Sequence, residues 1–292
     1  MSSPSVHGAS LAVGDFEITH VRYGLYRWDG GALFGVVPKT LWSRKAAADD
    51  LNRIELAFNC YLVRTRDHTI LIETGCGDKL DMRARARMDL PPDAEPLTSV
   101  IARHGFDPES IDIVINSHLH WDHCGGNTIL TGGTHSGPAR PAFPRARYVA
   151  SRPEWEHAHE RLARDGISYI DTNYDPLVES GQMALVEGDY EVAPDIWMRR
   201  APGHNRDMMV ITVASGGETF CFLSDLVPTE AHVQPTWVAA FDLCPLECIE
   251  SKTRWLTAAA EGAWQCAFGH DAKMPFARIL PDPKTGFTAA PL

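Results

Sequence analysis

The 292-residue sequence lacks any hydrophobic run that approaches the about 18 consecutive apolar residues of a membrane-spanning helix. Residues 1–8 contain neither the basic region nor the apolar stretch of a secretory signal peptide. Cysteine is also scarce, because seven residues without regular spacing do not make the framework of a disulfide-rich secreted domain. These absences predict reduced thiols, no membrane contact and a location in the cytoplasm.

An excess of basic side chains is absent too. Lys and Arg number 27 against 38 Asp and Glu, which gives a formal net charge of −11. Nucleic acids and anionic membranes both require a basic surface, so this charge argues against either as a partner. A small molecule remains as the expected partner, and the sequence leaves a homodimer open.

The composition is that of an ordinary globular protein, with 44% hydrophobic and 22% charged residues. The length fits one large domain, and no repeat or linker divides the chain. We therefore expect a flexible N-terminal arm over residues 1–10 and a single domain over residues 11–292.

Apolar patterning predicts strands and helices in an order that favours an α/β layered sandwich. Strands are predicted at 16–26, 57–63, 69–73, 111–115, 183–192, 196–200, 208–213, 219–223 and 264–268, the last of these being the final core strand. Helices are predicted at 97–104, 153–164 and 245–261. Glycine and proline content predicts a surface loop or hairpin at 28–42, an exposed loop or short helix at 79–96 and a long loop at 131–146.

Four side chains of the kinds that bind metal ions occur within six residues, namely His118, His120, Asp122 and His123. They follow an apolar strand, and in extended chain residues i and i+2 point the same way, so the first two histidines can hold one cation together. The turn after them brings the other two side chains to a second position, and Gly125-Gly126 permits a tight backbone path. Imidazole and carboxylate ligands suit zinc, with manganese, iron or cobalt as alternatives. A solvated histidine-rich loop is the structural alternative, which this density of ligands disfavours.

Three further candidate ligands stand at the ends of later predicted strands. His204 follows the strand at 196–200, Asp225 follows that at 219–223, and His270 follows that at 264–268. Each of these residues, taken singly, is more often structural. Their joint order behind the first motif makes them candidate metal ligands.

The chain resembles the metallo-beta-lactamase superfamily in a set of ordered motifs between about residues 57 and 271: His118-x-His120-x-Asp122-His123, Pro202-Gly203-His204, Ser224-Asp225 and Gly269-His270. This resemblance implies an αββα sandwich, in which two mixed β-sheets are flanked by helices. It places the site along one edge of the two sheets.

The same resemblance implies two divalent metal ions and divides the ligands between them. The first ion would be bound by His118, His120 and His204, and the second by Asp122, His123 and His270. Asp225 and a hydroxide would bridge the two ions. Glu73 stands where the family usually has the Asp of Asp-x-Gly, and its carboxylate would orient the metal-binding loop without contacting an ion.

Residues 30–39 and 226–232 resemble quorum-quenching N-acyl homoserine lactonases of the YtnP kind and, more loosely, methyl-parathion-hydrolase-type enzymes. The resemblance implies a hydrolase in which the bridging hydroxide attacks the carbonyl of a lactone or ester. Asp122 and Asp225 would be catalytic, and His232 is a candidate donor or proton source, with an ordinary surface histidine as the alternative. Better-known lactonases have a tyrosine three residues after the bridging Asp. Here that position is Pro228, so a phenol that binds the lactone must come from elsewhere.

Aromatic residues suggest a substrate-binding surface near the N-terminus. Trp28, Phe34 and Trp42 would line an apolar mouth, together with Trp121 and Trp237. Packing in the core or within a hairpin is the alternative for each of them.

Rival functions share parts of this pattern. Phosphotriesterases, arylesterases, thioesterases and β-lactamases use the same metal motifs and differ in the shape of the pocket. A di-iron redox protein is disfavoured because no flavodoxin-like extension is present. A metal-binding protein without catalysis is disfavoured by the complete set of ligands.

Overall fold

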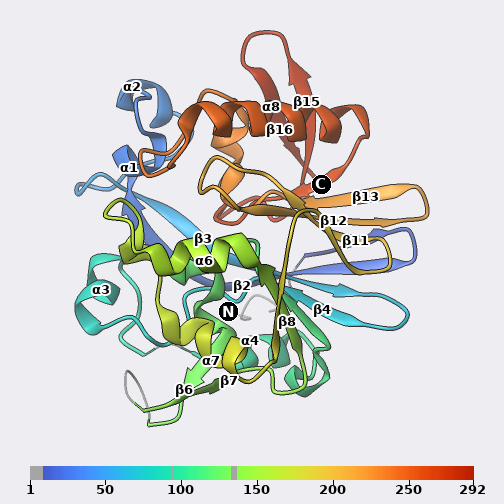
Figure 1. Cartoon of the computed structure of the whole chain (residues 1–292). Coiled ribbons are helices and arrows are strands. Elements are labelled where there is room, and N and C mark those ends of the chain that lie inside the picture. The colour runs from blue at the N-terminus through green and yellow to red at the C-terminus, as the bar shows by residue number, and fades with distance from the viewer. Residues whose placement is uncertain (1–8, 94, 133–136) are drawn as a thin grey trace, which may run out of the picture.

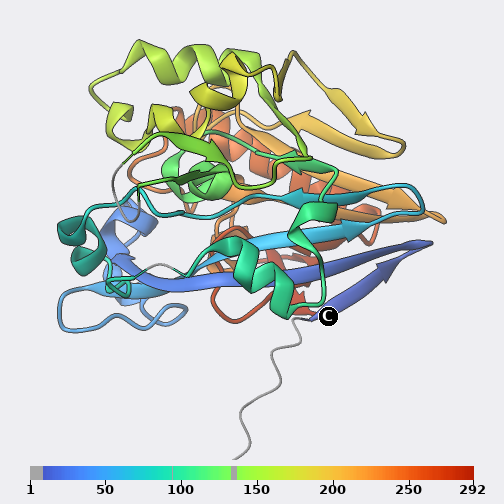
Figure 2. The same cartoon turned by 90° about the horizontal axis from the view of Figure 1, so that it is seen from below.

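The computed structural model describes residues 9–93, 95–132 and 137–292. Two large β-sheets lie face to face, and helices cover the outer face of each (Figure 1 and, from below, Figure 2). The prediction of an αββα sandwich with two mixed sheets is confirmed.

The first sheet has the strand order β1-β2-β3-β4-β5-β8-β9. Its strands are β1 Ser10–Val13, β2 Phe16–Asp29, β3 Arg53–Arg64, β4 Thr69–Ile72, β5 Ile113–Ile115, β8 Arg147–Ser151 and β9 Met183–Val186. The first four pair antiparallel, and the pairs from β4 to β9 are parallel. β3 is buried along almost its whole length, as expected for a strand covered on both faces.

The second sheet has the order β10-β11-β12-β13-β14-β15-β16 and is antiparallel except between β13 and β14. Its strands are β10 Tyr190–Ala193, β11 Ile196–Arg200, β12 Met209–Ser215, β13 Glu218–Phe222, β14 Gln265–Ala267, β15 Ala277–Asp282 and β16 Gly286–Pro291. A separate hairpin consists of β6 Thr128–Leu130 and β7 Ala139–Pro141.

Three hydrophobic clusters join these layers. Between the sheets, side chains such as Ile70 and Ile115 meet Ile211 and Phe222 in a fully buried core. The outer face of the first sheet packs against α4 Leu97–Arg103, α6 Arg152–Glu160 and α7 Asp175–Glu179. The outer face of the second packs against α8 Pro245–Glu261, through residues that include Leu256.

The remaining helices are short and lie in the connections. They are α1 Gly30–Phe34, α2 Lys39–Trp42, α3 Met82–Arg87 and α5 Trp121–Cys124, with 3-10 turns η1 Pro108–Ser110, η2 Gly125–Asn127, η3 Gly166–Ser168, η4 Asp171–Asn173, η5 Ser224–Leu226 and η6 Glu230–Val233. The helix predicted at 245–261 is confirmed with the same bounds, because Pro245 suits its first turn and Gly262 follows its end.

Three predicted elements require correction. Residues 28–42 are not a hairpin: the strand β2 ends at Asp29, whose carboxylate accepts a hydrogen bond from the Ala32 N–H and so caps α1. The strand predicted at 183–192 is two strands, β9 and β10, which belong to different sheets. The strand at 264–268 is not the last one, since β15 and β16 follow it.

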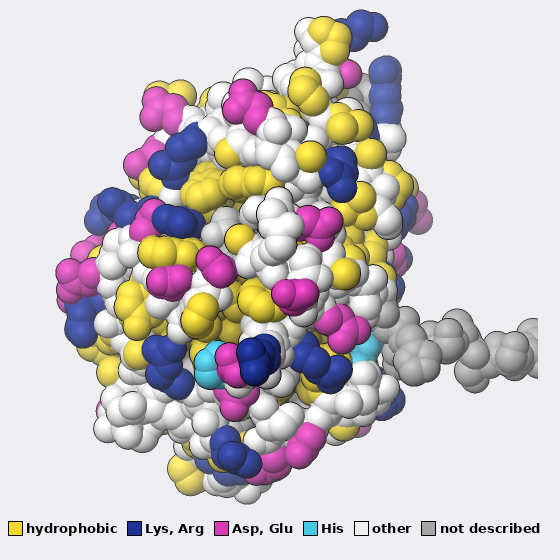
Figure 3. All heavy atoms as spheres, turned by 90° about the vertical axis from the view of Figure 1, so that its right-hand side faces the viewer, with side chains coloured by type: hydrophobic (Ala, Val, Ile, Leu, Met, Phe, Trp, Pro, Cys, Tyr) yellow, Lys and Arg dark blue, Asp and Glu magenta, His cyan; other side chains and the backbone are white. Residues whose placement is uncertain are grey.

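The predicted arm at 1–10 lies outside the described residues except for Ala9 and Ser10, and Ser10 begins β1. Among the described residues, no helix has the length and apolar character needed to cross a bilayer. Figure 3 shows a face on which basic and acidic side chains are interspersed among hydrophobic ones, without a basic patch. The predicted cytoplasmic location and the homodimer stay predictions.

Candidate metal centre and its cavity

Five strands end at one edge of the sandwich, and a predicted site residue follows each of them. The strands are β4, β5, β11, β13 and β14, and the residues after them are Glu73, His118, His204, Asp225 and His270. The two sheets are tied together at this edge, where the Met209 N–H donates to the Ser117 carbonyl over 2.9 Å. The topology therefore brings together side chains that are up to about 200 residues apart in the sequence.

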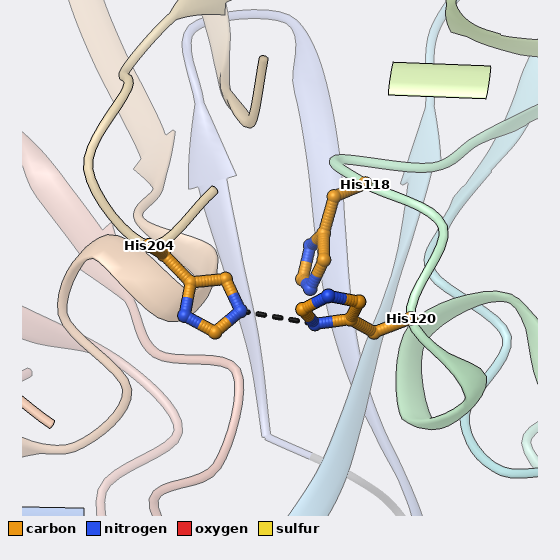
Figure 4. A group of neighbouring side chains, drawn as sticks. All are labelled: His118, His120 and His204. Atoms are coloured by element: carbon orange, nitrogen blue, oxygen red, sulfur yellow. Dashed lines mark hydrogen bonds between the residues drawn. The ribbon is translucent and has the colours of Figure 1, made fainter. Parts of the chain in front are cut away.

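Three histidines form the first group of metal-binding side chains. His118 and His120 come from the segment after β5, and His204 faces them from the loop between β11 and β12 (Figure 4). His204 Nε2 lies 3.0 Å from His120 Nδ1. The other nitrogen of His204, Nδ1, lies 2.8 Å from a carboxylate oxygen of Asp242 and must carry the ring proton. The lone pair of His204 Nε2 therefore points toward His120, as it would toward a shared cation.

Asp122, His123 and His270 form the second group. The Nε2 atoms of the two histidines are 3.2 Å apart, and His270 Nε2 is 3.6 Å from Asp122 Oδ2. Asp225 lies between the two groups. Its Oδ1 is 3.0 Å from His270 Nε2, and its Oδ2 is 3.4 Å from His204 Nε2.

These distances fit divalent metal ions. Zinc–nitrogen bonds of about 2.0–2.1 Å place neighbouring tetrahedral ligands roughly 3.3 Å apart. The donor atoms of each group lie within 4.8 Å of one another. The buried atoms without a hydrogen-bond partner among the described residues include His118 Nε2, His120 Nε2 and Asp225 Oδ1. A buried polar atom without a partner is costly, and a cation between the two groups would satisfy His118 Nε2 and Asp225 Oδ1.

Electrostatics keep the central carboxylate ionised. Burial by itself would raise the pKa of Asp225, but His270, His123 and His204 outweigh it and hold that pKa well below its usual range. For a histidine, burial has the opposite effect and lowers the pKa. The negative charge of Asp225 outweighs burial at His123 and His270, so that the pKa values of both are raised. Asp225 is therefore an anion that offers two oxygens to its neighbours.

The first two histidines are in a different electrostatic environment. Burial, reinforced by neighbouring histidines, lowers the pKa values of His118 and His120 well below the ordinary value. Both imidazoles are therefore neutral at physiological pH, which is the form that binds metal ions.

A cavity of about 210 Å³ opens directly above this cluster. Five of the predicted metal-binding residues lie in its floor: His120, Asp122, His204, Asp225 and His270. The walls are largely apolar or aromatic and consist of Tyr26, Trp28, Leu33, Trp121, Arg164, Asp165, Ile167, Ser168, Pro228 and Phe241.

The sequence profile of the metallo-beta-lactamase superfamily matches residues 55–264 of this chain. The chain belongs to the metallo-beta-lactamase superfamily. An N-acyl homoserine lactonase from Bacillus cereus is 27% identical over 177 residues, which cover 56% of this chain and 62% of that protein. The match thus spans less than two thirds of that relative's length.

Two solved structures are similar to this chain over nearly its whole length. A probable metal-dependent hydrolase from Staphylococcus aureus superposes with a TM-score of 0.85 at 28% identity, covering 96% of this chain and 99% of that chain. AidC, a dizinc quorum-quenching lactonase in complex with its product N-hexanoyl-L-homoserine, superposes with a TM-score of 0.79 at 18% identity, covering 99% of each chain. At that identity the similarity to AidC concerns the fold.

Two carboxylates lie next to candidate metal-binding histidines, Glu73 next to His123 and Asp242 next to His204. Glu73 accepts a hydrogen bond from the Ser117 N–H over 3.0 Å and lies 3.6 Å from His123 Nδ1, so its position suits the predicted orienting role. Asp242 was not predicted from the sequence, because only the fold brings it to His204. It also accepts a hydrogen bond from the Ala239 N–H over 3.1 Å, which fixes the carboxylate.

The strand β3 holds His270 in place, which no local sequence pattern predicts either. His270 Nδ1 lies 2.9 Å from the Ala57 carbonyl, and the Ala57 N–H donates to the His270 carbonyl over 3.0 Å. Asn59 adds hydrogen bonds to the carbonyls of Phe268 and Asp271. The first sheet therefore orients a side chain that comes from the second.

We expect the replacement Asp242→Asn to weaken zinc binding about 10–100-fold, the usual effect of removing a carboxylate behind a ligating histidine. The change removes the charge that fixes the His204 tautomer and keeps the size of the side chain. Competition with a chromophoric zinc chelator measures the affinity, and Asp67→Asn, in an exposed turn, is the matched control. Equal zinc affinity in the two variants would contradict the orienting role.

One predicted catalytic residue, His232, and two predicted substrate contacts, Phe34 and Trp42, require correction. His232 is 1% exposed and lies outside the cavity: its Nε2 donates to the Leu33 carbonyl over 2.9 Å, and its ring stacks on Phe34. Burial lowers the pKa of His232 to about 3, so this residue is a neutral structural histidine. Phe34 and Trp42 stack on each other in the core, because α1 and α2 turn them inward. Of the five aromatic residues predicted to line the substrate mouth, Trp28 and Trp121 line the cavity, whereas Trp237, like Phe34 and Trp42, does not.

Proposed function

We propose that the protein is a metal-dependent hydrolase that opens lactone rings, with N-acyl homoserine lactones as its substrate class. One observation carries the proposal: two groups of three metal-binding side chains flank a shared carboxylate, Asp225, on the floor of an apolar cavity. The names of the relatives and the fold shared with a dizinc lactonase support it.

The residues present fit two divalent ions, which we propose to be zinc. His118, His120 and His204 would hold one ion, and Asp122, His123 and His270 the other, with Asp225 between them. When bound, such ions supply Lewis acidity and make water a nucleophile near neutral pH.

The protein's own groups would position the substrate and carry the proton. Trp28, Trp121 and Phe241 present an apolar surface on which an acyl chain can bind, and this surface keeps bulk water from the reacting carbonyl. Of the two candidate metal-binding carboxylates in the cavity, Asp122 is the more exposed, with a side chain 16% exposed against 8% for Asp225. In hydrolysis the acyl carbon–oxygen bond breaks, and Asp122 would transfer the proton of the attacking water to the leaving oxygen.

A substrate panel tests this function. The zinc-loaded protein would be assayed with N-hexanoyl homoserine lactone, paraoxon, 4-nitrophenyl acetate, a glutathione thioester and nitrocefin. We expect the lactone to have the highest kcat/KM. A higher kcat/KM for paraoxon or the aryl ester would change the assigned activity from lactonase to phosphotriesterase or arylesterase. If none of the five compounds is turned over, the proposal that the protein is a hydrolase is overturned.

A further inference from the structure

Tyr26 is a cavity residue that the predicted site did not include. It lies near the end of β2, where it pairs in register with Leu56 of β3. Its ring stacks on Phe58, with centroids 4.2 Å apart and planes 4° apart, so its orientation is fixed. Its hydroxyl oxygen lies 3.1 Å from His270 Nδ1.

The hydrogen-bond partners of His270 show whether the Tyr26 hydroxyl can donate to it. His270 Nδ1 also lies 2.9 Å from the Ala57 carbonyl, which can only accept, so this nitrogen carries the ring proton. The Tyr26 hydroxyl therefore cannot donate to His270 Nδ1, and its proton is left for another partner. Among the described residues, none accepts that proton. Tyr26 lines the cavity, and the substrate is the acceptor that this arrangement leaves.

Pro228 also contacts His270. Pro228 lines the same cavity and cannot supply a polar side-chain group, while its carbonyl accepts a hydrogen bond from the His270 N–H over 2.9 Å. Tyr26 and Pro228 thus flank the same histidine. Tyr26 therefore brings a phenol to this cavity from β2.

We propose that Tyr26 is a further catalytic residue, whose hydroxyl donates a hydrogen bond to the oxygen that leaves the acyl carbon when the lactone ring opens. This inference rests on the proposed function for the identity of the substrate. The leaving oxygen is assigned because Tyr26 contacts His270, which belongs to the same group as Asp122, the residue that would carry the proton to that oxygen. The hydroxyl donates a hydrogen bond and transfers no proton.

The replacement Tyr26→Phe removes this donor and retains the ring that stacks on Phe58. The matched control is Tyr23→Phe, which makes the same change on the same strand in a residue that does not line the site cavity. The first measurement is calorimetric binding to the zinc-loaded proteins of N-hexanoyl-L-homoserine, which carries the freed hydroxyl. The second uses N-hexanoyl-L-2-aminobutyrate, which lacks that hydroxyl.

We expect Tyr26→Phe to weaken binding of the hydroxy acid about 2–10-fold, the range expected for one neutral hydrogen bond, and to leave the deoxy compound unchanged. We expect its kcat/KM for the lactone to fall about 10–100-fold, with a smaller loss for 4-nitrophenyl hexanoate, whose leaving oxygen needs little stabilisation. Zinc content should match that of Tyr23→Phe.

Equal weakening for the two ligands, or equal losses for lactone and aryl ester, would overturn the assignment of Tyr26. So would behaviour identical to that of Tyr23→Phe. If the wild-type protein shows the difference in binding but turns over no lactone, the proposed function fails, while the contact between Tyr26 and the hydroxyl oxygen stands.

Discussion

Replacing Asp225 by asparagine is expected to lower kcat/KM for the lactone about 1,000-fold, the upper range for loss of one preorganised electrostatic partner. Asp225 contacts His123, His204 and His270 through Nε2–oxygen distances of 3.0–3.4 Å and is the anion shared by both groups of ligands. An amide keeps the shape and removes the charge and one oxygen acceptor. Steady-state kinetics and metal analysis of the purified variant measure the effect.

The control for this variant is Asp50→Asn, an exposed residue outside the site. It should retain full activity and the full metal content. An Asp225→Asn variant that holds the wild-type amount of metal and loses less than about tenfold in kcat/KM would contradict the central position of this carboxylate.

Replacing Gly125 by alanine is expected to lower the free energy of unfolding by about 2–3 kcal/mol, as overpacking in a dense region does. A Cβ atom at Gly125 would lie 2.3 Å from the Cys76 carbonyl oxygen, which is backbone and cannot turn aside. The same segment pairs Gly75 with Cys124 and so fixes the helix that carries Asp122 and His123. Denaturant titration of the metal-free protein measures the change in free energy.

The melting temperature of Gly125→Ala should fall by about 4–10 °C. Gly24→Ala is its control, because a Cβ there would meet the Phe58 ring at an ordinary contact distance of 3.7 Å. Similar stability of the two alanine variants would show that the segments 74–77 and 124–126 are not rigidly interlocked.

Much of the metal centre was predictable because its geometry follows from strand ends. An apolar run predicts a strand, and the chain direction within that strand is fixed. The residues that follow the strand therefore lie at the end of a sheet, whichever of the two sheets the strand joins. His118, His204 and Asp225 could thus be named before their distances were known. The structure brings all seven predicted ligands together, and the assignment of each to an ion remains part of the proposal.

The supporting contacts were not predictable in the same way. Asp242 meets His204, and Tyr26 meets His270, across sequence separations of 38 and 244 residues that no local pattern encodes. His232 was misread because proximity in sequence to Asp225 says nothing about the direction of the side chain. The 3-10 turn η6 directs it at the Leu33 carbonyl instead.

The absence of long-range contacts from local sequence patterns also explains the wrong predictions of secondary structure. Glycine and aromatic residues at 28–42 suggested a hairpin, but the cap at Asp29 starts α1, and the rings of Phe34 and Trp42 pack inward. The strand-like pattern at 183–192 is uninterrupted and does not indicate that the chain crosses from the first sheet to the second within it. Local sequence predicted extended chain correctly there, and tertiary pairing decided which sheet each half joins.

We propose that a metal centre of two ions drives hydrolysis in this cavity. Elemental analysis of the purified protein, combined with lactone turnover before chelation, after chelation and after zinc is added back, tests this proposal. We predict two ions per chain, loss of turnover as the metal is removed and recovery on addition of zinc. Undiminished turnover in protein shown to be free of metal would contradict the account.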